Sequence, residues 1–124
     1  MENYAEYLES ILTASDTLQE ASRELGSGYD SIDEKYKSWI VWWDAWGSYD
    51  EEISRFIRIA KTGDKKEQLQ NLANILTEHR DKVVDFSLKL SEEVCNTFNV
   101  ISQETESVAA ETTSAIVDFG FDEL

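Results

Sequence analysis

No proline interrupts this 124-residue chain, and its glycines stand at only five positions, 26, 28, 47, 63 and 120. Proline and glycine are the residues that most strongly end a helix, so breaks are expected at few places. No stretch of alternating Val, Ile and Thr between turn dipeptides is long enough to predict a strand. We therefore predict an all-α fold, a helical bundle or helical hairpin of three to five helices with a long C-terminal helical segment.

Length and composition favour a single α-helical domain spanning residues 1–124. A chain of this size buries roughly two-thirds of its unfolded surface around one core. Hydrophobic residues make up 41% and aromatic residues 11% of the chain, which favours a packed core despite a net charge of -15. A folded, soluble protein is expected.

The first helix is expected in the acidic segment 1–34. Apolar and small side chains recur there at three- and four-residue spacing, which is typical of the buried face of a helix. Gly26-Ser27-Gly28 is predicted to end this helix, because glycine tolerates the left-handed turn that follows many helices. The predicted inner positions are Tyr4, Leu8, Ile11, Ser15, Leu18, Ser22 and Leu25.

Segment 31–62 contains all four tryptophans of the chain, at positions 39, 42, 43 and 46. Offsets of three, four and seven residues fall on one side of a helix, so the indoles are expected to form one aromatic ridge. We expect Gly47 to stop this helix and Ser48 to cap a second, short helix that ends near residue 62. The predicted inward stripe of the first helix is Ile32, Tyr36, Trp39, Trp43 and Trp46.

Segment 64–119 is the longest part of the chain without glycine or proline. A continuous helix over it would extend about 84 Å at about 1.5 Å per residue. Its apolar positions repeat as regularly as in a coiled coil, whereas a break near Ser91 or within 96–99 suits a compact bundle, and both arrangements stay open. Residues 120–124 are expected to form a tail. The apolar stripe comprises Leu69, Leu72, Leu76, His79, Val83, Phe86, Leu90, Val94, Phe98, Ile101, Thr105, Val108, Thr112, Ile116 and Phe119.

Acidic residues gather at the two ends of the sequence. Residues 1–34 carry nine acids and one base, residues 90–124 carry eight acids and no base, and the part between is almost balanced. Acidic surfaces repel nucleic acid and anionic lipid and attract basic partners, so we expect no direct nucleic-acid binding and no membrane association. The alternative is a solvated surface that only keeps the protein soluble.

The N-terminal sequence lacks the basic start and the apolar run of a cleaved signal peptide. No uncharged run approaches the length that spans a membrane. A cytoplasmic protein is therefore expected.

Few residues of this chain are suited to catalysis or metal binding. His79 is the only histidine and Cys95 the only cysteine, so neither a histidine-rich metal site nor an internal disulfide can form. The Glu-x-x-His spacing of di-iron bundles and a glycine-rich phosphate loop are both absent from the sequence. We therefore expect no enzymatic activity, no catalytic residue, no metal and no cofactor. The place of His79 on the apolar stripe favours a core or interface histidine satisfied by one hydrogen bond.

The aromatic ridge is the feature best suited to carry a function. Tryptophan is strongly enriched at binding hot spots, so the candidate partner-binding residues are Trp39, Trp42, Trp43 and Trp46. An apolar stripe at helical spacing is also typical of a core, so the alternative is that all four indoles fill the core. A mixed arrangement would place Trp39 and Trp43 inside, with Trp42 and Trp46 at a partner.

Trp46-Gly47-Ser48, between two expected helices, resembles the motif of the WXG family of small helical-hairpin proteins that bacteria export by type VII secretion. Phe119 with Glu123 is similar to that family's C-terminal export motif, an aromatic residue followed four positions later by an acid. Phe119 and Phe121 among acids form either a short recognition motif or a frayed end. The resemblance implies a secreted dimer, or a targeting partner of a toxin's helical region, exported without a cleaved signal peptide.

Two further resemblances are carried by short stretches of the chain. Residues 69–73, Leu-Gln-Asn-Leu-Ala, are similar to the second helix of some WXG proteins. Tyr29, Lys35 and Trp46-Gly47 are spaced as in the helical HeLo domains of fungal cell-death proteins.

The sequence therefore predicts a non-enzymatic helical interaction or adaptor protein that binds a partner protein through the aromatic ridge, with secretion targeting as one role. The alternative is an acidic inhibitor, a nucleic-acid mimic of the phage anti-defence type, that blocks a basic nucleic-acid-binding protein. Exposed seams on long helices commonly pair, so a homodimer is considered as well.

Overall fold

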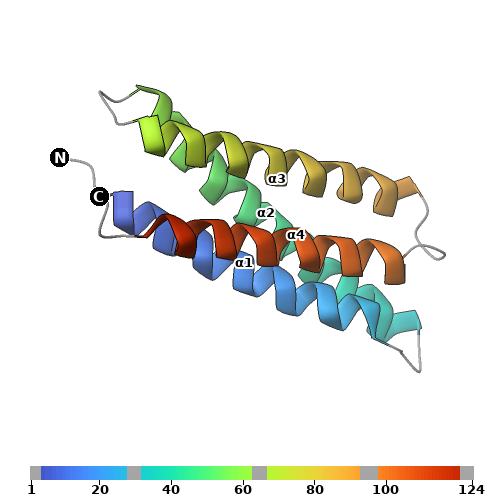
Figure 1. Ribbon diagram of the computed structural model, residues 1–124. Helices are drawn as coiled ribbons and strands as arrows, with labels where there is room; N and C mark the ends of the chain where they lie inside the picture. Colours follow the sequence, from blue (N-terminus) through green and yellow to red (C-terminus); the bar gives the residue numbers. More distant parts are fainter. Residues whose placement is uncertain (1–3, 28–31, 63–66, 93–97, 121–124) are drawn as a thin grey trace.

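The computed structural model describes residues 4–27, 32–62, 67–92 and 98–120 (Figure 1). These residues form helices and, within the described ranges, no strand, which confirms the predicted all-α helical bundle. The four helices are α1 (Tyr4–Gly26), α2 (Ile32–Thr62), α3 (Glu67–Glu92) and α4 (Phe98–Phe119).

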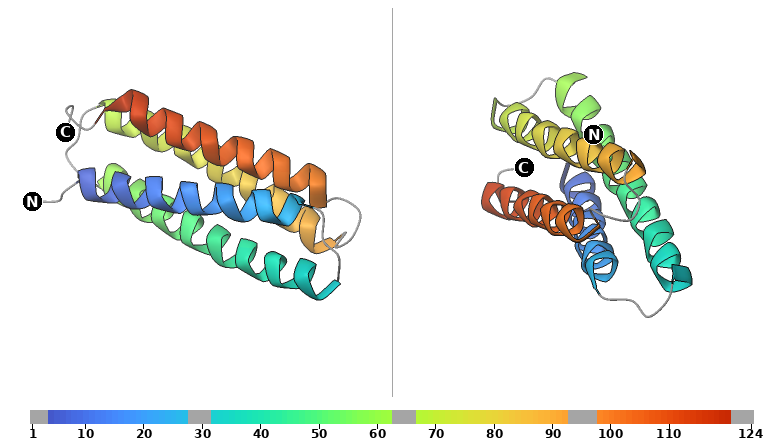
Figure 2. Two further views of the ribbon diagram at one scale, coloured as in Figure 1. Left: turned by 90° about the horizontal axis from the view of Figure 1, so that it is seen from below. Right: turned by 90° about the vertical axis from the view of Figure 1, so that its right-hand side faces the viewer.

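Successive helices run in opposite directions, which gives the bundle an up-down-up-down topology (Figures 1 and 2). α1 packs against α2 and α4, and α3 packs against the same two helices from the other side. The first residues of α1 and the last residues of α4 lie at the same end of the bundle. Of the helices described, none combines the length and the apolar character needed to cross a membrane.

The buried face of α1 is the one that the sequence predicts. All seven predicted inner positions are buried, and Ala14 and Ala21 are buried beside them. Gly26 lies so close to α4 that a Cβ there would collide with the hydroxyl of Ser102. The φ of Gly26 is not positive, so this glycine is needed for close helix packing and not for a left-handed turn.

α2 continues through Gly47, so the prediction that Gly47 stops the helix is wrong. A glycine inside a helix costs only about 1 kcal/mol relative to alanine. Tyr49, Ile53 and Phe56 are fully buried beyond it, and each large apolar side chain gains about 1.5–3 kcal/mol on burial. Ser48 consequently lies inside α2 and does not cap a helix.

Gly47→Ala is expected to raise the free energy of unfolding by about 0.5–1 kcal/mol. A Cβ at this position would meet no atom within 4 Å, and the backbone is already helical, so alanine adds helix propensity without a clash. Thermal unfolding followed by circular dichroism measures the change. Gly26→Ala is the matched control and is expected to lower stability, because its Cβ would strike Ser102. A lower melting temperature for Gly47→Ala would contradict this account of Gly47.

Segment 64–119 forms two antiparallel helices, so the undivided helix considered above is not formed. α3 ends at Glu92 and α4 begins at Phe98, which agrees with the alternative of a break and a compact bundle. α4 ends where Gly120 adopts a φ of 80° and its N–H donates to the carbonyl of Ile116 at 3.2 Å. A left-handed glycine of this kind is the commonest C-terminal cap of a helix.

The apolar stripe predicted for this segment is confirmed at the positions whose burial is described. Phe86 and Phe119 are partly buried against the core, and the other positions are buried. The buried positions are Leu69, Leu72, Leu76, His79, Val83, Ile101, Thr105, Val108, Thr112 and Ile116.

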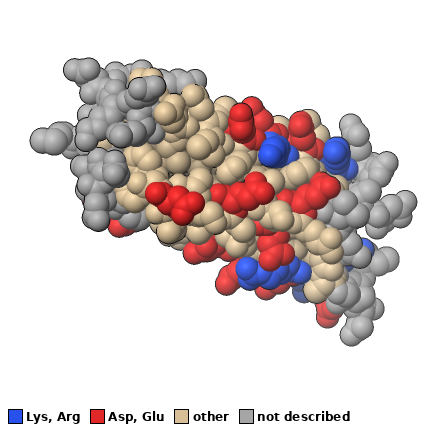
Figure 3. Space-filling model, viewed as in Figure 1, with Lys and Arg blue, Asp and Glu red and all other residues tan. Residues whose placement is uncertain are grey.

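Acidic side chains dominate the two helices α1 and α4. Five acids on α1 and four on α4 stand against the single base Arg23, whereas α2 and α3 together carry eleven acids and eight bases. Arg23 Nε pairs with a carboxylate oxygen of Glu106 at 2.7 Å. Figure 3, in the view of Figure 1, shows acidic side chains in a row along α4. Folding therefore brings the two acidic parts of the sequence side by side.

Candidate functional site

The four tryptophans and Tyr36 form a continuous aromatic ridge on the N-terminal half of α2. Trp43 stands at its centre, with ring centroids 5.4 Å from Trp42, 5.4 Å from Trp46 and 6.2 Å from Trp39, all in edge-to-face geometry. Tyr36 extends the ridge through a tilted contact with Trp39 at 5.7 Å. Edge-to-face pairs contribute about 0.5–1.5 kcal/mol each beyond burial, so the indoles hold one another in place.

Trp42 is the innermost member of the aromatic ridge. Its side chain is 0% exposed, and its indole N–H donates to the hydroxyl of Ser22 on α1 at 3.2 Å. The mixed arrangement, in which Trp42 reaches a partner, is therefore wrong for this residue. The hydrogen bond to Ser22 satisfies the one polar atom that Trp42 carries into the core.

The outer edge of the aromatic ridge reaches the surface. Trp39, Trp43 and Trp46 are partly buried against the core. Tyr36 is 57% exposed and Ile40 is 42% exposed. The positions predicted to face inward therefore lie at the edge of the core, and Tyr36 among them is exposed.

The structure assigns the buried face of α2 to other positions than the predicted stripe. The side chain of Ile32 lies outside the described residues. The buried positions of α2 are Trp42, Ala45, Tyr49, Ile53, Phe56, Ile57 and Ala60.

The side of α2 that carries Trp43 faces α3. Trp43 and Ser54 are eleven residues, about three turns, apart and lie on the same side of the helix. The hydroxyl of Ser54 accepts a hydrogen bond from Arg80 of α3 at 3.1 Å. α2 and α3 lie close at the 62 and 67 ends and diverge towards the N-terminus of α2 (Figures 1 and 2). The four indoles therefore belong to the half of α2 that diverges from α3.

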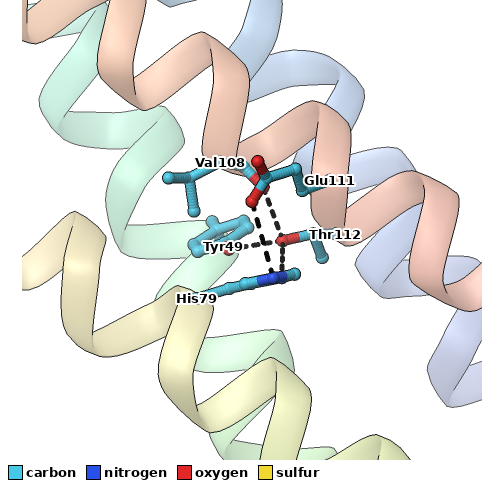
Figure 4. Close-up of polar contacts among 5 residues, drawn as sticks. All are labelled: Tyr49, His79, Val108, Glu111 and Thr112. Carbon is cyan, nitrogen blue, oxygen red and sulfur yellow. Dashed lines mark hydrogen bonds and ion pairs between the residues drawn. The ribbon is translucent and has the colours of Figure 1, made fainter.

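A second candidate feature is a buried polar network that joins three helices (Figure 4). Thr112 Oγ1 of α4 lies 2.8 Å from the Tyr49 hydroxyl of α2 and 2.9 Å from His79 Nδ1 of α3. The same oxygen lies 3.0 Å from the carbonyl oxygen of Val108. His79 Nε2 lies 3.8 Å from a carboxylate oxygen of Glu111. One threonine hydroxyl thus links α2, α3 and α4.

Burial controls the protonation of the two titratable residues in this network. Desolvation raises the pKa of Tyr49 from 10.0 to about 12, so its phenol stays protonated and can donate. Desolvation lowers the pKa of His79 below its ordinary value of 6.5, and the carboxylate of Glu111 opposes that shift without cancelling it. His79 is therefore mainly neutral at pH 7.

The prediction of a core histidine satisfied by one hydrogen bond is confirmed, because His79 is 9% exposed and bonds Thr112 through Nδ1. Sequence reasoning placed Thr112 on the buried stripe but missed its role. It missed Tyr49 altogether, because Tyr49 directly follows the helix break that was wrongly expected at residues 47 and 48. A helix continued through Gly47 would have brought Tyr49 onto the face of Trp42.

The candidate tail motif is described only in part. Phe119 ends α4 and is partly buried against the core. Phe121, Glu123 and Cys95 lie outside the described residues.

The fold and these two features define an antiparallel four-helix bundle with a partly buried aromatic ridge and a buried Tyr-Thr-His network. Comparison with family models, curated proteins and solved structures gives no match for this chain. Its function is therefore inferred from its own surfaces and side chains.

Proposed function

We propose that this chain is a non-enzymatic helical interaction protein that binds a partner protein through the exposed edge of the aromatic ridge. The observation that carries this proposal is the exposure of Tyr36 and Ile40 directly beside Trp39 and Trp43, which are only partly buried. Aromatic side chains that are held rigidly and half covered are typical of binding hot spots. A partner helix laid along this edge would bury them fully.

The internal support of the ridge favours this function. Trp42 anchors it to the core and to Ser22, and Trp43 contacts three other indoles, so the exposed edge is preorganised. A preorganised surface loses little conformational entropy on binding.

Ile40→Glu tests the proposal. We expect this variant to lose its partner, with at least roughly tenfold weaker capture from the cells that make the protein, because a carboxylate would enter an apolar contact. Ile40 is 42% exposed, so the melting temperature of the Ile40→Glu protein should hardly change. Leu88→Glu is the control, since Leu88 is 58% exposed on α3 and lies outside the ridge. Equal capture by the wild type and both variants would reject the aromatic edge as the binding surface.

A second candidate function is inhibition of a basic protein by the acidic helices α1 and α4. The nine acids of these helices, with Arg23 as the only base, favour it. Such binding is mainly Coulombic and should weaken steeply between low and high salt. Capture that is equal at both salt concentrations would count against an acidic inhibitor.

The WXG resemblance adds a specific role to the first function, that of a secreted protein or targeting partner that pairs with another helical chain or a second copy of itself. A small helical bundle is compatible with that role, although Trp46-Gly47-Ser48 lies within α2 and not between two helices. Export without a cleaved signal peptide is part of the same proposal, and fractionation of the producing cells tests it.

A further inference from the structure

A shallow groove runs between α3 and α4. α4 contributes mainly small side chains to it, Ser107, Ala110, Ser114 and Ala115. Small residues along a helix let another helix approach its backbone closely, as Gly26 and Ser102 show inside this bundle. The groove therefore has room for an incoming side chain.

Two carboxylates and one histidine give the groove its polarity. Glu111 and Asp118 line it from α4, and His79 lines it from α3. The two acids are seven residues, about two turns, apart and lie on the same side of α4. Among the described residues, no lysine or arginine forms an ion pair with either acid. Lys82 lines the adjoining part of the groove, towards Glu104.

Counting hydrogen-bond donors fixes which nitrogen of His79 carries the proton. The carbonyl of Val108 only accepts, so the single hydroxyl proton of Thr112 is used in the 3.0 Å contact with it. The hydroxyl oxygen of Thr112 must then accept from both of its other neighbours. Tyr49 donates through its phenol, and His79 donates through Nδ1–H. The neutral imidazole consequently has no proton on Nε2.

His79 Nε2 is thus a lone-pair acceptor that faces a second acceptor. It lies 3.8 Å from the carboxylate of Glu111, while its residue is only 9% exposed. Two acceptors at this distance repel unless a donor lies between them. In the free protein, a solvent water can be the donor between these two acceptors. A cationic N–H group would be a better donor because it also neutralises the negative charge of the carboxylate.

An arginine side chain fits this pair of acceptors better than a proton or a metal ion does. Burial disfavours the charged form of His79, which weighs against a bound proton at neutral pH. Within the described ranges, no three His, Cys, Asp or Glu side chains converge as a metal ion would require. A guanidinium group carries several N–H donors in a planar fork and can reach Nε2 and Glu111 together.

We propose that the groove between α3 and α4 binds the arginine side chains of a basic amphipathic helix, with one guanidinium group donating to His79 Nε2 and pairing with Glu111. A second arginine, seven residues along the partner helix, would meet Asp118. Ile75 is 42% exposed at the edge of the groove and would contact the apolar face of that helix. This surface is separate from the aromatic edge. The arginine site rests on the second proposed function, contact with a basic protein, and specifies which side chains would make that contact.

The first test is the state of the imidazole in the free protein. Because His79 is the only histidine, a long-range proton–nitrogen NMR spectrum reports its two ring nitrogens without assignment ambiguity. We expect a protonated Nδ1 and an unprotonated Nε2 at pH 7. The opposite tautomer would overturn the proposal, because Nε2 would then be a donor to Glu111.

The second test uses two synthetic helical peptides of about twenty residues, long enough to form a marginal helix alone. Both have the same composition with two arginines, which stand seven residues apart in one peptide and five apart in the other. Five-residue spacing places the arginines on different faces of the helix. We expect the seven-spaced peptide to bind about tenfold more tightly and to shift the His79 Nε2 resonance.

Glu111→Gln and Glu78→Gln are the matched variants for this binding experiment. Both acids are exposed and neighbour His79, but only Glu111 lines the groove. Glu111→Gln should remove most of the tenfold preference, and Glu78→Gln should keep it. Because both positions are exposed, both variants are expected to fold.

The remaining outcomes separate the arginine site from the second proposed function, inhibition of a basic protein by the acidic helices. Equal, salt-sensitive binding of both peptides would support the acidic face as a binding surface and overturn the arginine site. A shift of Nε2 on addition of zinc chloride, with none on addition of either peptide, would assign the groove to a metal ion and overturn the proposal as well.

Discussion

Trp42→Ala is expected to lower the free energy of unfolding by about 3–5 kcal/mol, the usual cost of removing a large buried aromatic side chain. Trp42 is 0% exposed and lies at the meeting point of α1 and α2. Its removal leaves a cavity, takes away the edge-to-face partner of Trp43, and leaves the hydroxyl of Ser22 without its indole donor. A small bundle has a total stability of only about 5–15 kcal/mol, so this one substitution would remove a large part of it.

Urea unfolding followed by circular dichroism measures this loss, since fluorescence would change with the tryptophan content. Val41→Ala is the neighbouring control: Val41 is 47% exposed, and its truncation is expected to change stability by less than about 0.5 kcal/mol. A Trp42→Ala protein as stable as the Val41→Ala protein would show that Trp42 does not belong to the core.

The buried faces of α1, α3 and α4 could be predicted because each follows one uninterrupted helical repeat. Leu8, Ile11 and Leu18 identify the inner face of α1 from spacing alone, and all three are fully buried. Among the described residues of these helices, no residue other than glycine has a positive φ that would compete with the apolar pattern.

The orientation of α2 could not be predicted because the sequence pattern indicates a helix end at Gly47. The first half of the helix, considered alone, has most of its aromatic residues on one side, and that side defines the predicted face. The second half fixes the true face, because Tyr49 and Ile53 lead back in steps of three and four residues to Ala45 and Trp42. One misplaced break therefore put Trp39, Trp43 and Trp46 on the predicted inward stripe and left Tyr49 off it.

The polar network could be predicted only in part for a different reason. His79 and Thr112 both lie on predicted buried positions, but they are 33 residues apart and meet only when α3 and α4 are antiparallel in one particular register. The sequence pattern of two separate helices does not contain that register.

Thr112→Val is expected to lower the free energy of unfolding by about 2–6 kcal/mol, although valine has nearly the same shape as threonine. The hydroxyl of Thr112 accepts from Tyr49 and from His79, and both donors are buried. A methyl group accepts nothing, so two buried donors lose their partner, and each unsatisfied donor costs about 1–3 kcal/mol. The phenol of Tyr49 is 0% exposed and cannot turn to solvent for a replacement.

Thr105→Val separates this effect from the general cost of removing a buried hydroxyl. Thr105 stands two turns earlier on the same face of α4 and is also 0% exposed. Within the described part of the chain, its hydroxyl bonds only the carbonyl of Ile101, at 2.7 Å. Its hydroxyl is the donor in that contact, and the carbonyl of Ile101 retains its place in the helix, so Thr105→Val should change stability by less than about 1 kcal/mol. Chemical denaturation of the two variants under identical conditions measures the difference. Equal losses would mean that Tyr49 and His79 find other acceptors, and the network would then contribute nothing specific to holding α2, α3 and α4 together.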